Sequence, residues 1–112
     1  MFAAQRFAPA AAIAMLAAFA SGPAAAACFE DVGCTNNQTM STAALKQLSC
    51  DALWTVRNTI YDENGYCFKT ARGKAVFSNA GCSYSNAASV PLNSYERTNI
   101  SKVVAVEKQK GC

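Results

Sequence analysis

The stretch from Leu48 to Phe68 constrains the fold most, because it carries both a helix start and a helix stop. Ser49 can cap the exposed amides of a first helical turn, and Asp51 places negative charge where the helix dipole favours it. Apolar residues then recur at the i, i+3 and i+7 spacing of one helical stripe, at Leu53, Val56 and Ile60. Asn64-Gly65 predicts the end of the helix, because both residue types accept the left-handed conformation of a C-terminal cap.

Two shorter helices are predicted on either side of this stretch. Ser41 can cap a helix over residues 42–48, and residues 28–39 before it are rich in turn formers and are predicted as a loop. Thr70 can cap a second short helix that ends before Asn79-Ala80-Gly81. Its interior glycine, Gly73, costs roughly 1 kcal/mol relative to alanine.

The last helix is predicted to begin at Asn93 and to end at Gly111. Asn93 and Glu96 have the spacing of a capping box, in which each side chain binds the backbone N–H of the other residue. The inward stripe is predicted at Ile100, Val103 and Val104 and continues to Glu107. Three lysines are expected to face water: Lys102, Lys108 and Lys110. No strand pattern is convincing, so the predicted fold class is all-α, a small helical domain of three principal helices stabilised by up to three disulfides.

The first 27 residues are typical of a secretory signal peptide. A positively charged lead up to Arg6 precedes an apolar run over residues 7–20, and Ala24 to Ala27 supply the small residues that signal peptidase accepts. The run is too short for a comfortable membrane span, which disfavours an N-terminal anchor helix. Cleavage after Ala27 would leave a loop and short-helix lead-in over residues 28–47 and a helical domain over residues 48–112, with no membrane span.

Six cysteines lie in the 85 residues that follow, namely Cys28, Cys34, Cys50, Cys67, Cys82 and Cys112. In an exported chain this number indicates three disulfides. Cys67 with Cys82 is the favoured pair, because the predicted helix between them would bring the two back together; the partners of the other four stay open. Cys28 also has a second interpretation. It follows small residues and could be the lipid-acceptor cysteine of a lipoprotein. Ala25 replaces the leucine usual for that signal, and lipidation would leave an odd number of cysteines, so a periplasmic or secreted protein is favoured over a lipid-anchored one.

Composition argues against several function classes. The sequence contains no histidine, which excludes an imidazole base, Ser-His-Asp or Cys-His nucleophiles and histidine-ligated metals. No Cys-x-x-Cys pair is present, so neither a metal nor a cofactor is expected. Without Arg6, nine Lys or Arg residues face seven Asp or Glu residues, and this net charge of +2 is too mild to indicate nucleic-acid binding.

Several residues of the central stretch form a recognisable set: Leu53-Trp54, Arg57-Asn58, Ile60-Tyr61, Gly65-Tyr66 and Phe68. Together with Tyr95-Glu96-Arg97-Thr98-Asn99-Ile100, they resemble the YARHG domain, a small bacterial extracytoplasmic module named for its Tyr-Ala-Arg-His-Gly motif. The resemblance covers roughly residues 48–107. The naming motif is degenerate, because this chain has Tyr61-Asp62-Glu63-Asn64-Gly65 and keeps only the outer tyrosine and glycine. The resemblance implies a fold and a compartment without implying an activity.

Arg57 has two interpretations, and the first is a ligand site. It lies between Trp54 and Tyr61 on neighbouring helical turns, within stacking reach of either ring. With Tyr66, these aromatic residues would present flat faces to a sugar ring while Arg57 meets a carboxylate. That combination suits a fragment of peptidoglycan, which carries sugars and acidic peptide stems.

The second interpretation is structural and is the more favoured. Arg57 would pair with Glu96 of the last helix, while Asn58 or Asn99 bonds exposed backbone groups. Gly65 would permit the sharp turn after the central helix, and aromatic residues including Phe68 would fill the space under it.

The function predicted from these patterns is an exported, non-enzymatic cell-envelope module that binds cell-wall material or a partner protein. The alternative is a small extracytoplasmic hydrolase or enzyme inhibitor that uses Glu63 or Glu96 as its acid. Adjacent carboxylates such as Asp62 and Glu63 point in different directions on a helix, which makes them poor partners across a glycosidic bond.

Overall fold

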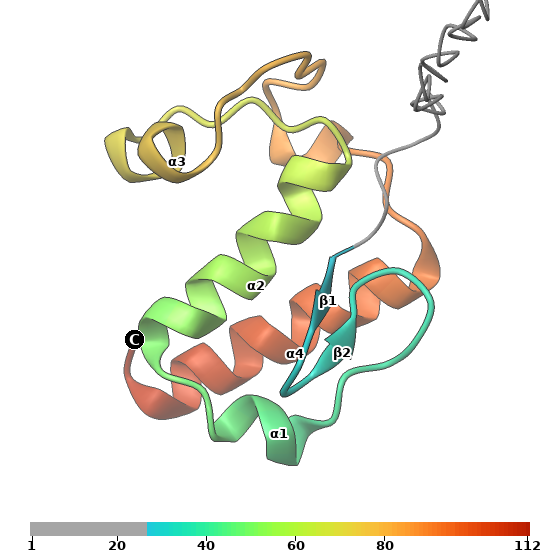
Figure 1. Ribbon diagram of the computed structural model, residues 1–112, viewed down its shortest axis with the longest axis vertical. Helices are drawn as coiled ribbons and strands as arrows, with labels where there is room; N and C mark the ends of the chain where they lie inside the picture. Colours follow the sequence, from blue (N-terminus) through green and yellow to red (C-terminus); the bar gives the residue numbers. More distant parts are fainter. Residues whose placement is uncertain (1–26) are drawn as a thin grey trace, which may run out of the picture.

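Residues 27–112 are described by a computed structural model, and the predicted signal peptide, except for Ala27, lies outside them. The described elements are, in chain order, β1 (Cys28–Phe29), β2 (Gly33–Cys34), α1 (Thr42–Lys46), α2 (Cys50–Glu63), α3 (Ala71–Val76), a 3-10 turn η1 (Ala87–Ser89) and α4 (Ser94–Lys110) (Figure 1). Helices dominate and each strand has only two residues, so the predicted all-α fold class is confirmed.

Every α-helix in residues 27–112 begins at the cap residue that the sequence predicts. The cap side chains accept hydrogen bonds from first-turn N–H groups, Ser41 from Ala44, Ser49 from Ala52, Thr70 from Gly73 and Asn93 from Glu96. The capping box of α4 is complete, because Glu96 Oε1 also accepts from Asn93 N–H at 2.9 Å. α2 ends as predicted, with Asn64 as its cap and Gly65 at a φ of +89°.

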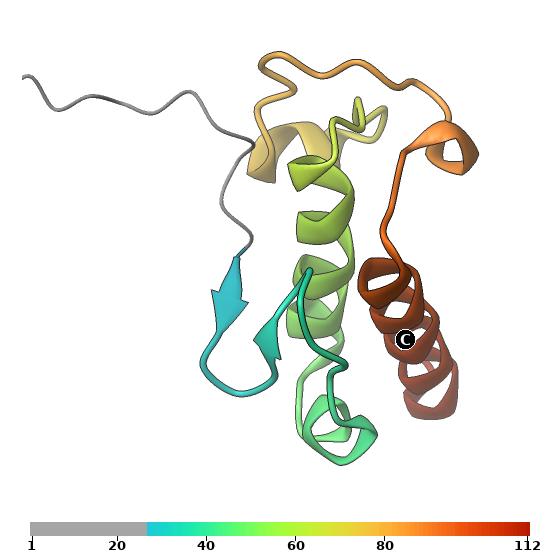
Figure 2. The ribbon, with the colours of Figure 1, turned by 90° about the vertical axis from the view of Figure 1, so that its right-hand side faces the viewer.

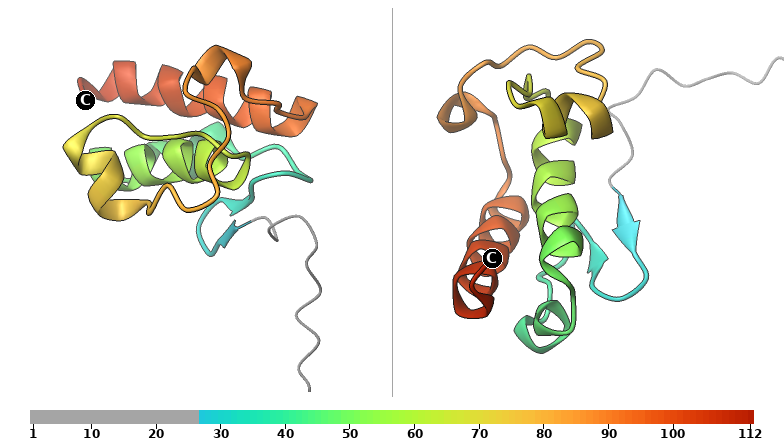
Figure 3. Two further views of the ribbon diagram at one scale, coloured as in Figure 1. Left: turned by 90° about the horizontal axis from the view of Figure 1, so that it is seen from above. Right: turned by 90° about the vertical axis from the view of Figure 1, so that its left-hand side faces the viewer.

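α2 occupies the middle of the molecule. The hairpin β1–β2 lies on one side of it and α4 on the other (Figures 2 and 3). The apolar stripe predicted on α2 is buried, with Leu53, Val56 and Ile60 at most 2% exposed. The main core joins this stripe to residues of the hairpin, α1 and α4, namely Val32, Met40, Leu45, Leu53, Val56, Val103 and Val106.

The inward face of α4 differs from the prediction. Its buried residues are Glu96, Asn99, Val103 and Val106, whereas Ile100, Val104 and Glu107 are only half-buried. Two polar residues, Glu96 and Asn99, occupy the first half of the buried face, so the apolar pattern alone places the stripe one residue away. Lys102 also differs, because it is half-buried and its Nζ donates to the carbonyl of Met40 at 3.0 Å rather than facing water.

The segment predicted as a loop at residues 28–39 begins with a small antiparallel hairpin. Cys28 pairs with Cys34 in the ladder, and Gly33 adopts a φ of +92°. The same two cysteines are joined by a disulfide, which uses the sulfur that a lipid anchor on Cys28 would require.

Two further disulfides complete the pairing. Cys67 is bonded to Cys82, the pair favoured from the sequence. Cys50 is bonded to Cys112 and joins the start of α2 to the residue after the cap of α4. The two long helices therefore run antiparallel, and their contact is fixed covalently at one end.

Candidate functional site

Five aromatic side chains form a continuous row that starts and ends on α2. Trp54 contacts Phe77 at 6.0 Å between ring centroids, and Phe77 stacks on Phe68 at 4.7 Å. Phe68 meets Tyr66 edge-on at 4.9 Å, and Tyr66 meets Tyr61 at 5.7 Å. We call these five residues the aromatic row. Two of its members, Phe68 and Phe77, are buried, while the other three are half-buried and reach the surface.

The turn after α2 bends the chain back over this helix. Gly65 has positive φ, and its carbonyl accepts hydrogen bonds from the N–H groups of Ser83 and Tyr84. Asn79 receives the N–H of Phe68 at 2.7 Å and donates to its carbonyl at 2.9 Å. The bond between Cys67 and Cys82 closes the same loop. These contacts hold Tyr66 against Tyr61 of α2 and Phe68 against Gly73 of α3.

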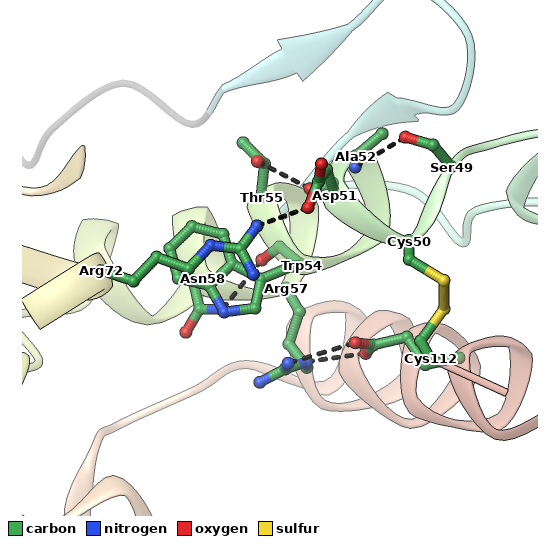
Figure 4. A network of polar contacts seen from close by, with 11 residues as sticks. Ser49, Cys50, Asp51, Ala52, Trp54, Thr55, Arg57, Asn58, Arg72 and Cys112 are labelled. Atoms are coloured by element: carbon green, nitrogen blue, oxygen red, sulfur yellow. Dashed lines mark hydrogen bonds and ion pairs between the residues drawn. A yellow bond between two sulfur atoms is a disulfide. The ribbon is translucent and has the colours of Figure 1, made fainter. Parts of the chain in front are cut away.

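Trp54 carries a cation on its ring, and the cation is Arg72 of α3. The guanidinium carbon of Arg72 lies 3.8 Å from the ring centroid (Figure 4). Arg72 Nη2 also binds Asp51 Oδ1 at 2.8 Å, with the two side chains 51% and 89% exposed. Eighteen residues separate Arg72 from Trp54, and no short-range spacing could have indicated that they meet.

Arg57 points the other way, toward α4 (Figure 4). Its Nε and Nη2 donate to Glu107 Oε1 and Oε2 at 2.8 and 3.2 Å. The prediction that Arg57 pairs with Glu96 is therefore wrong. In the antiparallel pair, Arg57 in the middle of α2 lies opposite Glu107 near the end of α4, and Glu96 is eleven residues or about 16 Å away along that helix.

Glu96 instead joins α4 to the end of α2. One carboxylate oxygen serves the capping box, and the other accepts from Asn64 Nδ2 at 2.6 Å. Only 5% of Glu96 is exposed.

Glu63 also has both oxygens engaged, one with the N–H of Ala27 and one with the hydroxyl of Thr35 at 2.9 Å. Asp62, the residue before Glu63, is exposed, and its partial desolvation raises the pKa of its carboxyl above the ordinary value.

The two asparagines assigned a structural role both bond backbone groups. Asn58 donates to the carbonyl of Trp54 at 2.8 Å, one helical turn earlier. Asn99 is fully buried; it accepts from the N–H of Met40 at 2.9 Å and donates to the carbonyls of Thr35 and Gln38 at 3.1 and 2.9 Å. Asn99 thereby fixes the irregular segment between the hairpin and α1.

Two hollows lie away from the aromatic row. One of about 440 Å³ adjoins the Arg57–Glu107 pair at the end of α4. Another of about 340 Å³ lies between the hairpin and α2, with Phe29, Val32 and Leu48 in its wall. Neither is lined by a member of the aromatic row. Within residues 27–112, no group of three or more Cys, Asp or Glu side chains is placed to hold a metal ion.

Comparison with protein families matches residues 30–108 to the YARHG domain. This chain belongs to the YARHG domain family. No curated protein and no solved structure matches it. YARHG domains are extracytoplasmic, and three disulfides fit the oxidising environment of such a compartment. In the part of the chain that the structure describes, no helix has the length and apolar character of a membrane span.

The degenerate YARHG motif acts as a junction in this structure. Glu63 and Asn64 replace the arginine and histidine of the motif, and they bind the hairpin segment and Glu96 of α4 respectively. Tyr61 belongs to the aromatic row and Gly65 supplies the turn. The hairpin segment, α4 and the aromatic row of the YARHG domain therefore meet at the end of α2.

Proposed function

We propose that this YARHG domain is a non-enzymatic cell-envelope module that binds cell-wall glycan on the aromatic row. The observation that carries the proposal is the covering of Trp54: a large, half-buried ring whose contact with solvent is limited by one exposed arginine. Trp and Tyr rings offer rigid, amphipathic contact area at low entropic cost, which suits the flat faces of sugar rings.

The cover on Trp54 can be removed at little cost. An exposed ion pair such as Arg72–Asp51 contributes about 0–1 kcal/mol, and an exposed cation–π contact contributes roughly 0.5–1 kcal/mol. A sugar that stacks on Trp54 would displace Arg72, and the freed guanidinium would bind a carboxylate on the same ligand. Lys69, just before α3, and Lys74, within it, are both exposed and add positive charge to the α3 segment that carries Arg72. The ligand class is therefore an acidic glycan, of which peptidoglycan is the envelope example.

The non-enzymatic character rests on the absence of histidine and on the two candidate acids. Glu63 and Glu96 each have both carboxylate oxygens in hydrogen bonds that hold the fold together. A hydrolase would need one of them free to give a proton to its substrate. Arg57, the ligand-binding candidate in the less favoured of its two interpretations, is already paired with Glu107, so Arg72 takes its place in the proposed site.

Co-sedimentation with purified peptidoglycan sacculi tests the proposal. We expect the oxidised protein to be retained in about 1 M salt, where the Debye length falls to roughly 3 Å and simple attraction of a weakly cationic protein is screened. Trp54→Ala should lose retention. Tyr95→Ala is the matched control, because Tyr95 is 45% exposed on α4 and lies outside the aromatic row. Circular dichroism would verify that both variants are folded.

Equal retention of the Trp54→Ala and control proteins would rule out the aromatic row as the binding surface. Retention that is lost at high salt would show that the interaction is electrostatic attraction alone. If the wild-type protein is not retained at all, a protein partner becomes the better hypothesis.

The covering role of Arg72 gives a second prediction. Arg72→Ala should bind a neutral chitin oligosaccharide about two- to thirtyfold more tightly, because about 0.5–2 kcal/mol is no longer spent on uncovering Trp54. The same variant should lose preference for an acidic muramyl glycan over the neutral one. Isothermal titration with both ligands measures this, with Lys108→Ala as the matched control, because it removes an exposed cation of α4 away from the aromatic row. An unchanged preference for the acidic ligand would contradict the assignment of Arg72.

A further inference from the structure

Ala27 is held by both of its backbone polar groups. Its N–H donates to Glu63 Oε1, and its carbonyl accepts from the N–H of Thr35 at 3.1 Å. Thr35 is fully buried, and its hydroxyl binds the second oxygen of Glu63 at 2.9 Å. Ala27, Thr35 and Glu63 thus form a closed set of contacts that includes Ala27 in the folded domain.

Among residues 27–112, the Glu63 carboxylate has no side-chain cation as a partner. The ion pairs within residues 27–112 are Arg57–Glu107 and Arg72–Asp51, so no Lys or Arg in that part of the chain lies within ion-pair distance of Glu63. Glu63 is half-buried, where a carboxylate gains most from a charged donor. The donor that Glu63 has in this position is the backbone nitrogen of Ala27. This nitrogen carries a positive charge only when Ala27 is the first residue of the chain.

We propose that the leader peptide is removed between Ala26 and Ala27, so that the α-ammonium group of Ala27 forms an ion pair with Glu63. Water adds across this peptide bond, the C–N bond breaks, and the leader departs with a new carboxylate. The nitrogen stays on Ala27 and is protonated at neutral pH. The inference rests on the predicted export of the chain and is independent of glycan binding.

The sequence permits this cleavage as readily as cleavage after Ala27. Ala24-x-Ala26 has the same small-residue pattern as Ala25-x-Ala27. The folded structure distinguishes cleavage after Ala26 from cleavage after Ala27. Cleavage after Ala27 would remove a residue that makes two backbone hydrogen bonds and would leave Glu63 Oε1 and the Thr35 N–H without these partners. Lipoprotein processing before Cys28 would remove the same residue.

The mass of the mature protein tests the proposal directly. The full chain with its own leader is expressed in an exporting bacterium, and the intact mass of the oxidised product is measured. We expect the mass of residues 27–112 with three disulfides. A product that begins at Cys28, one that carries lipid on Cys28, or one that retains the leader would each overturn the proposal.

The ion pair itself makes a pH-dependent prediction. An α-amino group titrates at about 7.7–8.0 in model peptides, and pairing with Glu63 raises its pKa in the folded state. The stabilisation is therefore complete below about pH 7.7 and is lost as the pH rises through the folded value. The urea midpoint of Glu63→Gln should lie well below that of the wild type at pH 7, and the gap should shrink by pH 10.

Glu30→Gln is the matched control, because it removes one exposed carboxylate from the same hairpin. Its midpoint should follow the wild-type curve at every pH. Wild-type and Glu63→Gln curves that stay parallel from pH 6 to pH 10 would overturn the ion pair. If Glu63→Gln does not fold, NMR titration of the wild-type α-amino group decides, since an unraised pKa would exclude the pair.

Discussion

At the scale of single residues, the buried asparagine Asn99 holds together a segment that has no regular secondary structure. It is 0% exposed, and its side chain satisfies three backbone groups of a segment without regular structure. A buried backbone group left without a partner costs about 1–3 kcal/mol. One polar side chain therefore replaces the hydrogen bonds that a helix or a strand would have supplied to the chain at residues 35–40.

Asn99→Leu should consequently lower the free energy of unfolding by about 3 kcal/mol or more, although leucine is apolar and similar in size. Urea denaturation followed by circular dichroism measures the loss. Asn37→Ala, an exposed change in the same segment, is the control and should stay within about 0.5 kcal/mol of the wild type. A loss below about 1 kcal/mol for Asn99→Leu would show that water replaces the amide.

Gly73 provides a second prediction at this scale. A Cβ atom added there would lie 2.7 Å from Cδ1 and 2.9 Å from Cβ of Phe68. Gly73→Ala should therefore destabilise the protein by about 1–3 kcal/mol through overpacking, even though alanine favours a helix by roughly 1 kcal/mol. The midpoint of thermal unfolding measures the change. Lys74→Ala, at the next position and exposed, should be nearly neutral, and a stabilised Gly73→Ala protein would contradict the steric argument.

At the scale of elements, the contact between α2 and α4 is aligned by two polar links. Arg57 binds Glu107 near the end of α4. Asn64, the cap of α2, binds Glu96 in the first turn of α4. The sequence indicates the caps and the apolar stripe of α2 because both are local patterns. It does not indicate which carboxylate faces Arg57, because that choice depends on the direction and register of a helix forty residues away. The same limitation explains the misplaced stripe on α4, whose buried face is half polar.

The Arg57–Glu107 pair can be tested with a double-mutant cycle. The two side chains are 26% and 15% exposed, so removing one partner leaves the other partly buried and unpaired. Arg57→Met and Glu107→Leu should each cost about 1–2 kcal/mol, and the double variant should cost less than their sum by about 1 kcal/mol. Urea midpoints of the four proteins give the coupling. Strict additivity would show that the pair does not act as a unit.

At the scale of the whole molecule, the three disulfides close loops of very different lengths. Cys50–Cys112 spans 62 residues, Cys67–Cys82 spans 15 and Cys28–Cys34 spans 6. The sequence favours the Cys67–Cys82 pair, because a helix between two cysteines is a local signal. The longest pair depends on the antiparallel packing of α2 and α4, and the shortest depends on a hairpin without an apolar alternation. Local patterns bring together the members of the aromatic row that lie on α2 and in the following turn. Phe77 and Arg72 fall outside those patterns, and their contacts with Trp54 depend on the tertiary fold.

Loop length predicts the order of their contributions. In the chain-entropy view, the 62-residue loop contributes about 4 kcal/mol and the 6-residue loop about 2 kcal/mol. The Cys50→Ser/Cys112→Ser protein should therefore be less stable than the Cys28→Ser/Cys34→Ser protein by about 2 kcal/mol. Non-reducing urea titrations compare them directly. The reverse order would mean that the hairpin bond also holds native contacts that depend on Glu63.

The bond between Cys50 and Cys112 also determines how the domain would carry mechanical load. A pull applied across Cys28 and Cys112 would pass through the first disulfide to Cys34, along the backbone to Cys50, and through the second disulfide to Cys112. Residues 51–111, which include α2, α3, α4 and the whole aromatic row, would carry no tension. The molecule could lengthen by no more than the slack in residues 34–50, whose fully extended span is about 55 Å. A surface that binds a stretched polymer would thus keep its shape under a force that unravels the segment beside it.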